Sequence, residues 1–325
     1  MPPTTAGHQT TLSYLWEKDA DDNPDFLATV MEDSDHKPFG ANARLTTRSG
    51  ANNAVRTFDP GSREASEAIE QEFTGSWTVE FELTNPWFLQ GVLGHEVTDD
   101  GGAAATTYNF DGNVPYPFRI YTGNRATGNE EILKGAVASS FSVSISTAGN
   151  AVCSLDGAYA DSIVSSGGVT TQPDRTNRPL TYASASVQRE GELFSLTQNA
   201  QISIENNVDM IQELGSRVAT AYSPKARVVN LQYDKIVQNS DELNRFYGGG
   251  NSPQSTVENE TEVVLTFDNG LSGSDQRLIK WTLKDTLSTS YDRTGIGDPQ
   301  SDLEESLQDI VPSVSATAIV SESIR

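Results

Sequence analysis

The sequence has few of the residues that disulfide-stabilised proteins and metalloenzymes use. Among 325 residues there is one cysteine, Cys153, and there are three histidines, His8, His36 and His95. A single cysteine cannot form an internal disulfide, and its place in the alternating stretch 151–159 predicts a buried thiol. The histidines lie in polar surroundings without metal-ligand spacing. We therefore expect surface histidines and no zinc site.

Long apolar runs are also absent, so no segment is expected to cross a bilayer. The first residues lack the basic and apolar regions of a secretory signal, which argues against that export route. The Asp19-x-Asp21-x-Asn23 spacing is typical of the start of a calcium loop, but Pro24 stands where glycine is needed and Val30 where the bidentate glutamate is needed. We interpret this segment as a solvated acidic loop and expect no cofactor or metal.

The known catalytic signatures are missing too. There is no nucleophile elbow, no Walker loop and no dinucleotide fingerprint, since Gly295-x-Gly297 precedes Asp298-Pro299 and cannot open a helix. Carboxylate pairs exist, but among 45 acidic residues some pair always does. We expect a protein that is not an enzyme, and an acid-pair hydrolase is the enzymatic alternative.

Basic residues are scarce, and the charge of the chain is strongly negative. There are 45 acidic and 22 basic residues, a formal net charge of −23, and only seven of the bases are lysines. Acid excess keeps a protein hydrated at molar salt, where the Debye length is only about 3 Å. The composition predicts a halophilic source. It also argues against nucleic-acid binding, which needs basic stripes.

What the chain does have is an internal repeat. Residues 52–94 align without a gap on residues 206–248, with nine identities at a constant offset of 154. Asn52-Asn53 corresponds to Asn206-Asn207, and Gly61-Ser62-Arg63 corresponds to Gly215-Ser216-Arg217. A duplicated module without duplicated catalytic residues is typical of a building block rather than an enzyme.

Alternating patterns indicate a mostly β protein. Between Phe73 and Leu83 the odd positions are mainly apolar and the even positions polar, so one face is expected to be buried and the other wet. Residues 229–237 repeat this pattern in the same phase, interrupted at Lys235 and Ile236. Because a slip of one residue would reverse every face, the shared phase supports the repeat.

A short helix is predicted after each of these strands. In the first copy Asn85 is the expected N-cap, Pro86 the first helical residue and Gly94 the stop signal. In the second copy Asn239 and Gly248 have the same roles. The two copies therefore share a strand followed by a helix.

These stretches resemble a known family. Three motifs show the likeness. The first is Gly-Ser-Arg after Asn-Asn, and the second is the long strand that ends in residues 84–94 (Thr-Asn-Pro-Trp-Phe-Leu-Gln-Gly-Val-Leu-Gly). The third is residues 133–137 (Leu-Lys-Gly-Ala-Val), which lead into a strand with serine at every second position. Together they resemble the tail tube, or major tail, proteins of long-tailed siphovirus-like viruses. The likeness covers residues 39–164 and again 182–322. With the acidic composition, it points to a tailed virus of a halophilic archaeon or bacterium, and an archaeal host is favoured.

The resemblance implies a fold and an organisation. We expect two tandem β-sandwich or half-barrel domains, each with a short flanking α-helix, at residues 39–164 and 182–325. Residues 1–38 would form an N-terminal arm and 165–181 a linker. The family's role implies rings that stack into a hollow tube in the virion tail, assembled in the host cytoplasm. Two domains per chain favour a trimeric ring of pseudo-six-fold symmetry, with a hexamer as the alternative.

The expected partners are further copies of the chain and the tape measure, tail terminator and distal tail proteins, with viral double-stranded DNA in transit and not specifically bound. An acidic or neutral polar wall would let DNA slide, because a basic wall would bind phosphates. The candidate lumen-facing residues are Glu80, Glu82, Asp234, Ser142, Ser144 and Ser146. The alternative is that they form a solvated outer face.

A second hypothesis concerns contacts between subunits or rings. Segments 54–60 and 208–214 are placed to reach the next ring, and the candidate residues are Arg63, Arg217, Asp59 and Glu213. Alternatively, the two arginines stabilise turns in their own domains. Two other functions stay open at this point: a distal tail or baseplate ring protein of the same fold, and a secreted β-sandwich adhesin or glycan-binding module.

Overall fold

The computed structural model describes residues 10–19, 21, 23–28, 36–58, 60, 63–94, 106–124, 129–147, 149–165, 178–255, 261–272, 275–296 and 302–320. In the first half the elements are β1 (Thr10–Trp16), β2 (Ala41–Phe58), β3 (Ala65–Glu82), α1 (Leu89–Leu93), β4 (Thr106–Phe110), β5 (Phe118–Asn124), β6 (Asn129–Ser146), β7 (Val152–Tyr159) and β8 (Asp161–Ser165).

The second half contains a short 3-10 helix, η3 (Tyr182–Ser184), then β9 (Ala185–Arg189), β10 (Glu192–Leu193), β11 (Thr197–Glu205), β12 (Val208–Ile211), β13 (Ala221–Pro224), β14 (Val228–Ile236), α2 (Asp241–Phe246), β15 (Thr261–Asp268), β16 (Arg277–Thr294), β17 (Glu304–Ile310) and β18 (Ser313–Val320). The prediction of a mostly β protein is confirmed.

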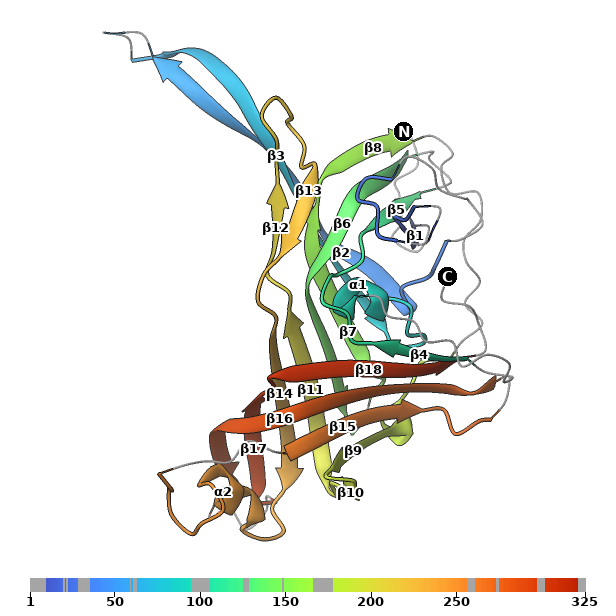
Figure 1. Cartoon of the computed structure of the whole chain (residues 1–325), viewed down its shortest axis with the longest axis vertical. Coiled ribbons are helices and arrows are strands. Elements are labelled where there is room, and N and C mark those ends of the chain that lie inside the picture. Colours follow the sequence, from blue (N-terminus) through green and yellow to red (C-terminus); the bar gives the residue numbers. More distant parts are fainter. Residues whose placement is uncertain are drawn as a thin grey trace, which may run out of the picture.

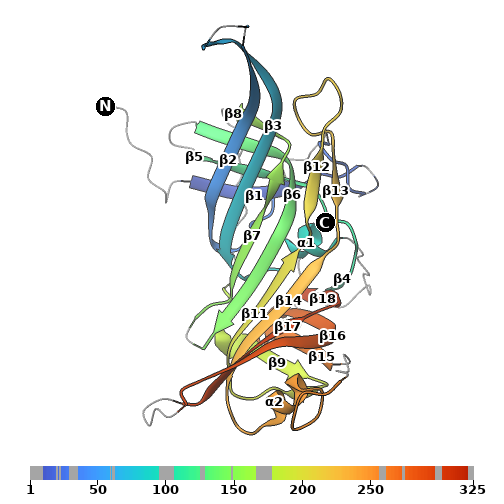
Figure 2. The ribbon, with the colours of Figure 1, turned by 90° about the vertical axis from the view of Figure 1, so that its left-hand side faces the viewer.

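One antiparallel sheet runs through both halves (Figure 1). Its central strands follow the order β2-β3-β7-β6-β11-β14-β17-β16, and the two halves join where β6 pairs with β11. Viewed from the side, these strands form one oblique ribbon that descends from β2 to β17 (Figure 2). We call these eight strands the shared sheet.

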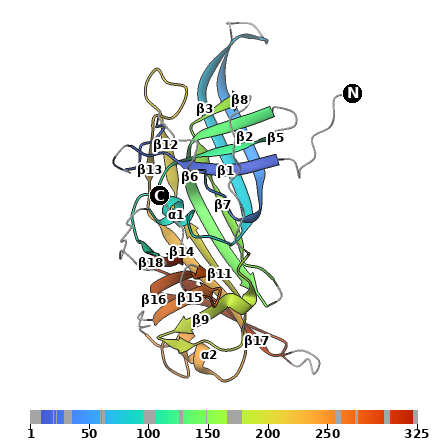
Figure 3. The same ribbon diagram turned by 90° about the vertical axis from the view of Figure 1, so that its right-hand side faces the viewer.

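A second layer covers one face of the shared sheet in each half (Figure 3). The long strands β6 and β16 belong to both layers: the amino-terminal part of β6 pairs with β5 and β8, and that of β16 pairs with β15 and β18. β1 extends the first outer layer and β9 the second. β4 crosses over from the first half to pair with β18. The core lies between the layers.

The strand pairings of the first half recur in the second. β1 pairs with β5 as β9 pairs with β15, and β3 pairs with β7 as β14 pairs with β17. The register recurs as well: Thr47 lies opposite Thr78, and 154 residues later Gln201 lies opposite Gln232. The offset in the sequence is therefore also a spatial equivalence. The domain boundaries themselves stay a prediction.

Apolar and polar residues alternate along each central strand, and the apolar side chains fill the core. Trp77, Val79 and Phe81 of β3 are buried, and Trp281 of β16 is fully buried in the second half. Each such side chain contributes about 1.5–3 kcal/mol by leaving water. Gly75 is required on β3, because a Cβ there would lie 2.4 Å from the ring of Tyr159.

The two helices begin later than predicted. α1 has Phe88, not Asn85, at its N-cap, because residues 86–89 form a tight turn first and the Asn85 amide donates to Thr84 Oγ1 instead. In the second copy Ser240 is the N-cap, while Asn239 Oδ1 accepts a hydrogen bond from the Asp241 amide. All residues of α1 are buried, so the helix packs into the core.

Two hairpins project beyond the shared sheet on the same side (Figures 1 and 2). One is formed by β2 and β3, since β7 pairs with β3 only from Gly75 onward. The other is β12 with β13. They lie side by side: the amide of Phe73 donates to Arg217 O (2.7 Å) and Gln212 Nε2 donates to Phe73 O (3.3 Å).

Parts of the predicted arm and linker have structure. In the arm, Tyr14 and Trp16 of β1 are buried in the first-half core. In the linker, Leu180 is buried and its amide donates to Leu83 O (2.8 Å), whereas residues 166–177 lie outside the described part of the chain. Within the described residues, no helix has the length and apolar character needed to span a membrane.

Candidate functional site

The predicted lumen-facing residues all lie on one face of the shared sheet, opposite the core. Ser146 pairs with Asn199, and Asn199 pairs with Asp234, so three strands bring these side chains into one row. A second row contains Glu80, which faces Ser154, which in turn faces Ser142. Glu82 and Ser144 form a third row through Val152. We call this surface the polar face.

Four further acidic residues share the polar face: Asp156, Glu205, Asp292 and Glu304. Their register places them there, since Asp156 faces Thr78 and Ser140, and Asp292 faces Ser306 beside Asp234. Sequence reasoning did not single them out, although the same alternation, applied to β7, β11, β16 and β17, would have found them.

No lysine or arginine points outward from the polar face in the described strands from β3 to β16. At the margin, Arg44 of β2 forms an ion pair with Glu80 (Nη2–Oε2, 2.6 Å), in which the Arg44 side chain is 72% and the Glu80 side chain 37% exposed. Elsewhere the face presents hydroxyl and amide groups and a few exposed apolar side chains, Val152 and Ile310 among them. Asn199 Nδ2 donates to Asp234 Oδ2 (3.2 Å). Such a surface repels phosphate groups and gives them no cation to bind.

The candidate contact residues lie at the projecting hairpins. Arg63 is exposed at the end of the first hairpin, and Glu213 is exposed at the tip of the second, where its carbonyl accepts from the Ser216 amide (3.0 Å). Arg217 bridges the two hairpins within one chain, because its Nη2 donates to Asn52 Oδ1 (3.1 Å). Asp59 lies outside the described residues. A role for the four residues between rings stays a prediction.

A buried charged cluster lies beneath α2, and its one trace in the sequence is the break in alternation at Lys235. Lys235, which interrupts the predicted alternation, stays on the core side and faces Glu242 (3.5 Å) and Glu305 (3.8 Å). Burial raises the pKa of Glu242, but Arg189, Lys235 and Arg245 lower it by more, so its pKa is below the usual value. We name these side chains, with Arg293 and Asp309, the charged cluster.

The other sequence candidates have structural explanations. Asp19 Oδ1 accepts from the amides of Asp21 and Asn23, which closes the acidic loop as a turn, while Val30 lies outside the described residues. His36 Nδ1 lies 3.1 Å from Ser13 Oγ. Among the described side chains, no group of three or more His, Cys, Asp or Glu is placed to hold a metal ion. Burial raises the pKa of Cys153 well above its ordinary value.

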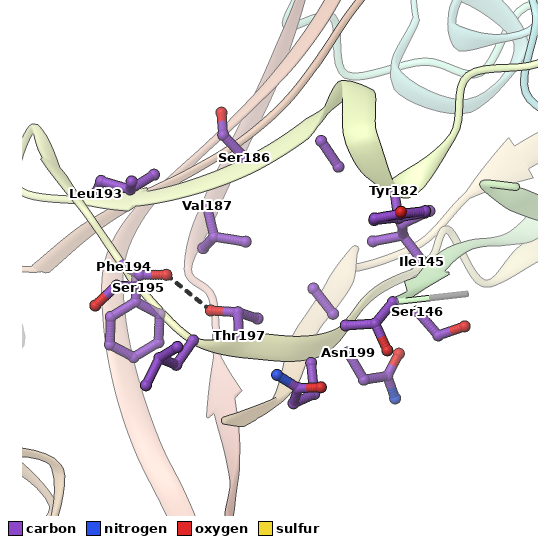
Figure 4. A pocket seen from close by; sticks show the side chains of 15 residues that line it. Ile145, Ser146, Tyr182, Ser186, Val187, Leu193, Phe194, Ser195, Thr197 and Asn199 are labelled. Carbon is purple, nitrogen blue, oxygen red and sulfur yellow. Dashed lines mark hydrogen bonds between the residues drawn. The ribbon is translucent and has the colours of Figure 1, made fainter. Parts of the chain in front are cut away.

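An apolar pocket lies at the edge of the sheet, between β9, β10 and the start of β11 (Figure 4). Val187, Leu193 and Phe194 line it, and Thr197 Oγ1 donates to Phe194 O (2.9 Å). Ser146 and Asn199 mark the side on which it meets the polar face. The lining contains hydroxyl, amide and apolar groups, without a carboxylate, lysine or histidine.

Comparison with known proteins agrees with this architecture. The family described as phage tail tube protein matches residues 7–318. The chain belongs to this family. It is a structural component of the virion tail, in a family whose members build the tail tube, and that family is not one of enzymes.

Other comparisons add little to the family assignment. Among solved structures, the tube-terminating cap of the anti-feeding prophage, determined by cryo-electron microscopy, is similar at 14% sequence identity and a TM-score of 0.33. That alignment covers 46% of this chain and 97% of the cap. The curated proteins contain no match.

Proposed function

We propose that copies of this tail tube protein close into rings, that the rings stack into a hollow tube, and that the polar face lines the channel for the viral genome. The observation that carries the proposal is the sign of the charge on this face. Seven acidic residues point outward from β3 to β16 without a basic one in these described strands. DNA carries about one negative charge per 1.7 Å, so such a wall does not retain it.

The strand count favours three copies in a ring. Each chain contributes eight strands to the shared sheet. With strands about 4.8 Å apart and tilted by about 40°, three copies (about 24 strands) close into a cylinder about 48 Å across, or about 38 Å inside the side chains. Two copies give about 32 Å across, which leaves a duplex no clearance, and six give about 96 Å, far wider than needed. A trimer with pseudo-six-fold symmetry fits best.

The hairpins supply the contact between rings in this proposal. Both hairpins project from the same side of the shared sheet (Figure 2). Arg63, at the end of the first hairpin, and Glu213, at the tip of the second, are exposed. Reversing one charge at a time (R63E or E213K) is expected to shorten the tubes and leave single rings intact. Tubes of unchanged length would assign both residues to their own hairpins. Because Arg217 already bonds Asn52, its reversal would disturb the chain itself.

The setting follows from the composition. We propose a long-tailed virus of a halophilic archaeal host, with assembly in the host cytoplasm and contacts to the tape measure, tail terminator and distal tail proteins. The excess of 45 acids over 22 bases supports function at molar salt. Electron microscopy of the purified chain in high salt distinguishes the related possibilities: long tubes indicate the main tube protein, and single closed rings a distal tail protein.

The channel is tested by reversing its charge. The variant E80K/E82K/D234K is expected to form normal tubes that retain duplex DNA at low salt and to slow genome delivery. The matched control E190K/E192K/D285K changes the charge equally at exposed residues away from the polar face. Equal DNA retention by the two variants, or unchanged delivery with the first, would remove the polar face from the channel.

A further inference from the structure

The shared sheet ends in two edges that lack a second strand among the described residues. At one end, segment 46–52 of β2 pairs only with β3; at the other, segment 287–294 of β16 pairs only with β17. All residues from 46 to 52 are exposed, including Arg48 and Gly50, whose backbone places them on the core side. Their equivalents 154 residues later, Ile202 and Ile204, are fully buried. The difference is the neighbouring strand, β6, which covers β11.

The repeat shows which residues correspond at these edges. Ser203 and Ser49 are equivalent, because they lie opposite Asn230 and Ser76, which are 154 residues apart. Ser142 and Asp292 are equivalent as well. Ser142 lies opposite Ser154, which lies opposite Glu80. Asp292 lies opposite Ser306, which lies opposite Asp234, and Glu80 and Asp234 are again 154 residues apart.

Asn206, one of the asparagines that recur in the repeat, lies at the junction between β6 and β11. Asn206 is buried between β11 and β6, where its Oδ1 accepts from Arg227 Nε (3.0 Å) and its Nδ2 donates to Val92 O (2.9 Å). The equivalent Asn52 is exposed. Its Oδ1 likewise accepts from an arginine, Arg217, but its Nδ2 has no hydrogen-bond partner among the described residues.

We propose that the joint between β6 and β11 is repeated between chains, so that segment 287–294 of one copy pairs antiparallel with segment 46–52 of the next. Ser203 lies opposite Ser142 within the chain. The same register places Ser49 opposite Asp292 across the interface, Thr47 opposite Thr294 and Ala51 opposite Ser290. This inference rests on the proposed ring and specifies how it closes.

The same register also brings Arg48 of one copy opposite Arg293 of the other, on the core side. Like charges directly opposite each other are unfavourable on their own. Here each arginine has its own carboxylate, since Arg48 pairs with Glu131 and Arg293 Nη2 lies 3.8 Å from Glu305. The four groups can alternate in sign across the interface, so the register is electrostatically acceptable.

Disulfide cross-linking tests the register. Residues directly opposite on antiparallel strands have Cα atoms about 4.5–5.5 Å apart, within the range that a disulfide spans. The variant S49C/D292C is expected to give covalent dimers and trimers on mild oxidation of assembled tubes, which reduction reverses. The controls are both single variants and the shifted pairs S49C/S290C and S49C/T294C, whose diagonal spacing is roughly 7–8 Å.

The outcomes separate this inference from the proposed function. Tubes in which a shifted pair cross-links, or in which no pair does, would overturn the register and leave the ring intact. Wild-type chain that forms neither rings nor tubes would refute the proposed function itself. Native Cys153 is fully buried and is not expected to compete.

Asn52 supplies an independent measurement. If its amide donates to the next copy as Asn206 donates to Val92, N52A should raise the protein concentration needed for assembly by up to about tenfold, the effect of losing one hydrogen bond. N53A is the matched control, because Asn53 Nδ2 donates to Glu72 Oε1 (2.8 Å) in its own hairpin. Equal effects of the two variants would contradict the role given to Asn52.

Discussion

Replacing Glu242 by glutamine should destabilise the chain strongly, because Glu242 is the acid on which the charged cluster converges. Its side chain is 3% exposed, and its Oε1 lies 2.7 Å from Arg189 Nη1 and 3.5 Å from Lys235 Nζ. The glutamine keeps the shape but removes the charge, so two buried cations lose their nearest counter-charge. Among the described residues, Glu305 is the acid that remains close to Lys235, at 3.8 Å.

The expected magnitude follows from burial. Breaking a buried ion pair by removing one partner costs about 3–5 kcal/mol, and Glu305 and Asp309 offset part of this, so we expect E242Q to lower the free energy of unfolding by about 3 kcal/mol. The control is E80Q, which removes the exposed pair with Arg44. Such pairs contribute about 0–1 kcal/mol.

Chemical denaturation of the unassembled chain, followed by tryptophan fluorescence, measures both variants. At molar salt the effect of E80Q should vanish, whereas that of E242Q should persist, since buried pairs are screened much less. The pH dependence has a definite sign. Because the pKa of Glu242 is lowered in the fold, its contribution is present above the pKa in the unfolded chain, about 4.3, and is lost as the pH falls through the folded value. A cost below about 1 kcal/mol at neutral pH would refute the reasoning.

Three other changes have expected outcomes. G157A should destabilise the fold by roughly 1–3 kcal/mol, because its Cβ would lie 1.9 Å from Val137 O. G149A should not, because its Cβ would meet only Ser146 Oγ, at an ordinary contact distance of 3.7 Å; thermal unfolding compares the two variants. The Cys153 thiol should react with a thiol reagent only after denaturation, since burial raises its pKa. Burial also raises the pKa of Tyr222 to about 12. The free energy of unfolding should therefore fall as the pH rises from about 10 to 12, and it should fall less in Y222F. An alkaline absorbance titration in which this phenol ionises near 10 would contradict the prediction.

The sequence was sufficient for the faces of the strands, because alternation is a local property. The parity of Glu80, Ser142 and Asp234 placed each on the wet side of its own strand, and the structure brings all three to one surface. The mostly β character and the equivalence of residues 52–94 with 206–248 follow from the same kind of local pattern. Which strands lie next to one another does not.

What the sequence could not show depends on partners distant in the chain. The pairing of β6 with β11 joins the halves, and that of β4 with β18 sends a first-half strand into the second-half layer. No alternation signals either. The same holds for Lys235. In the sequence it interrupts the apolar positions of a core strand, and only the fold shows that its buried ammonium lies near the carboxylates of Glu242 and Glu305. The late start of α1 depends on the turn at 86–89, where a local hydrogen bond competes with the cap.

The position of the charges supports a channel more strongly than their total does. Adaptation to salt explains an excess of acids anywhere on the surface, but it gives no reason to exclude bases from one face. The bases nearest the shared sheet lie elsewhere: Arg48, Lys235 and Arg293 on the core side, and Arg44 at the margin beside Glu80. The lysine variant of the polar face separates the two explanations, because it and its control change the total charge equally and differ only in where the charge lies.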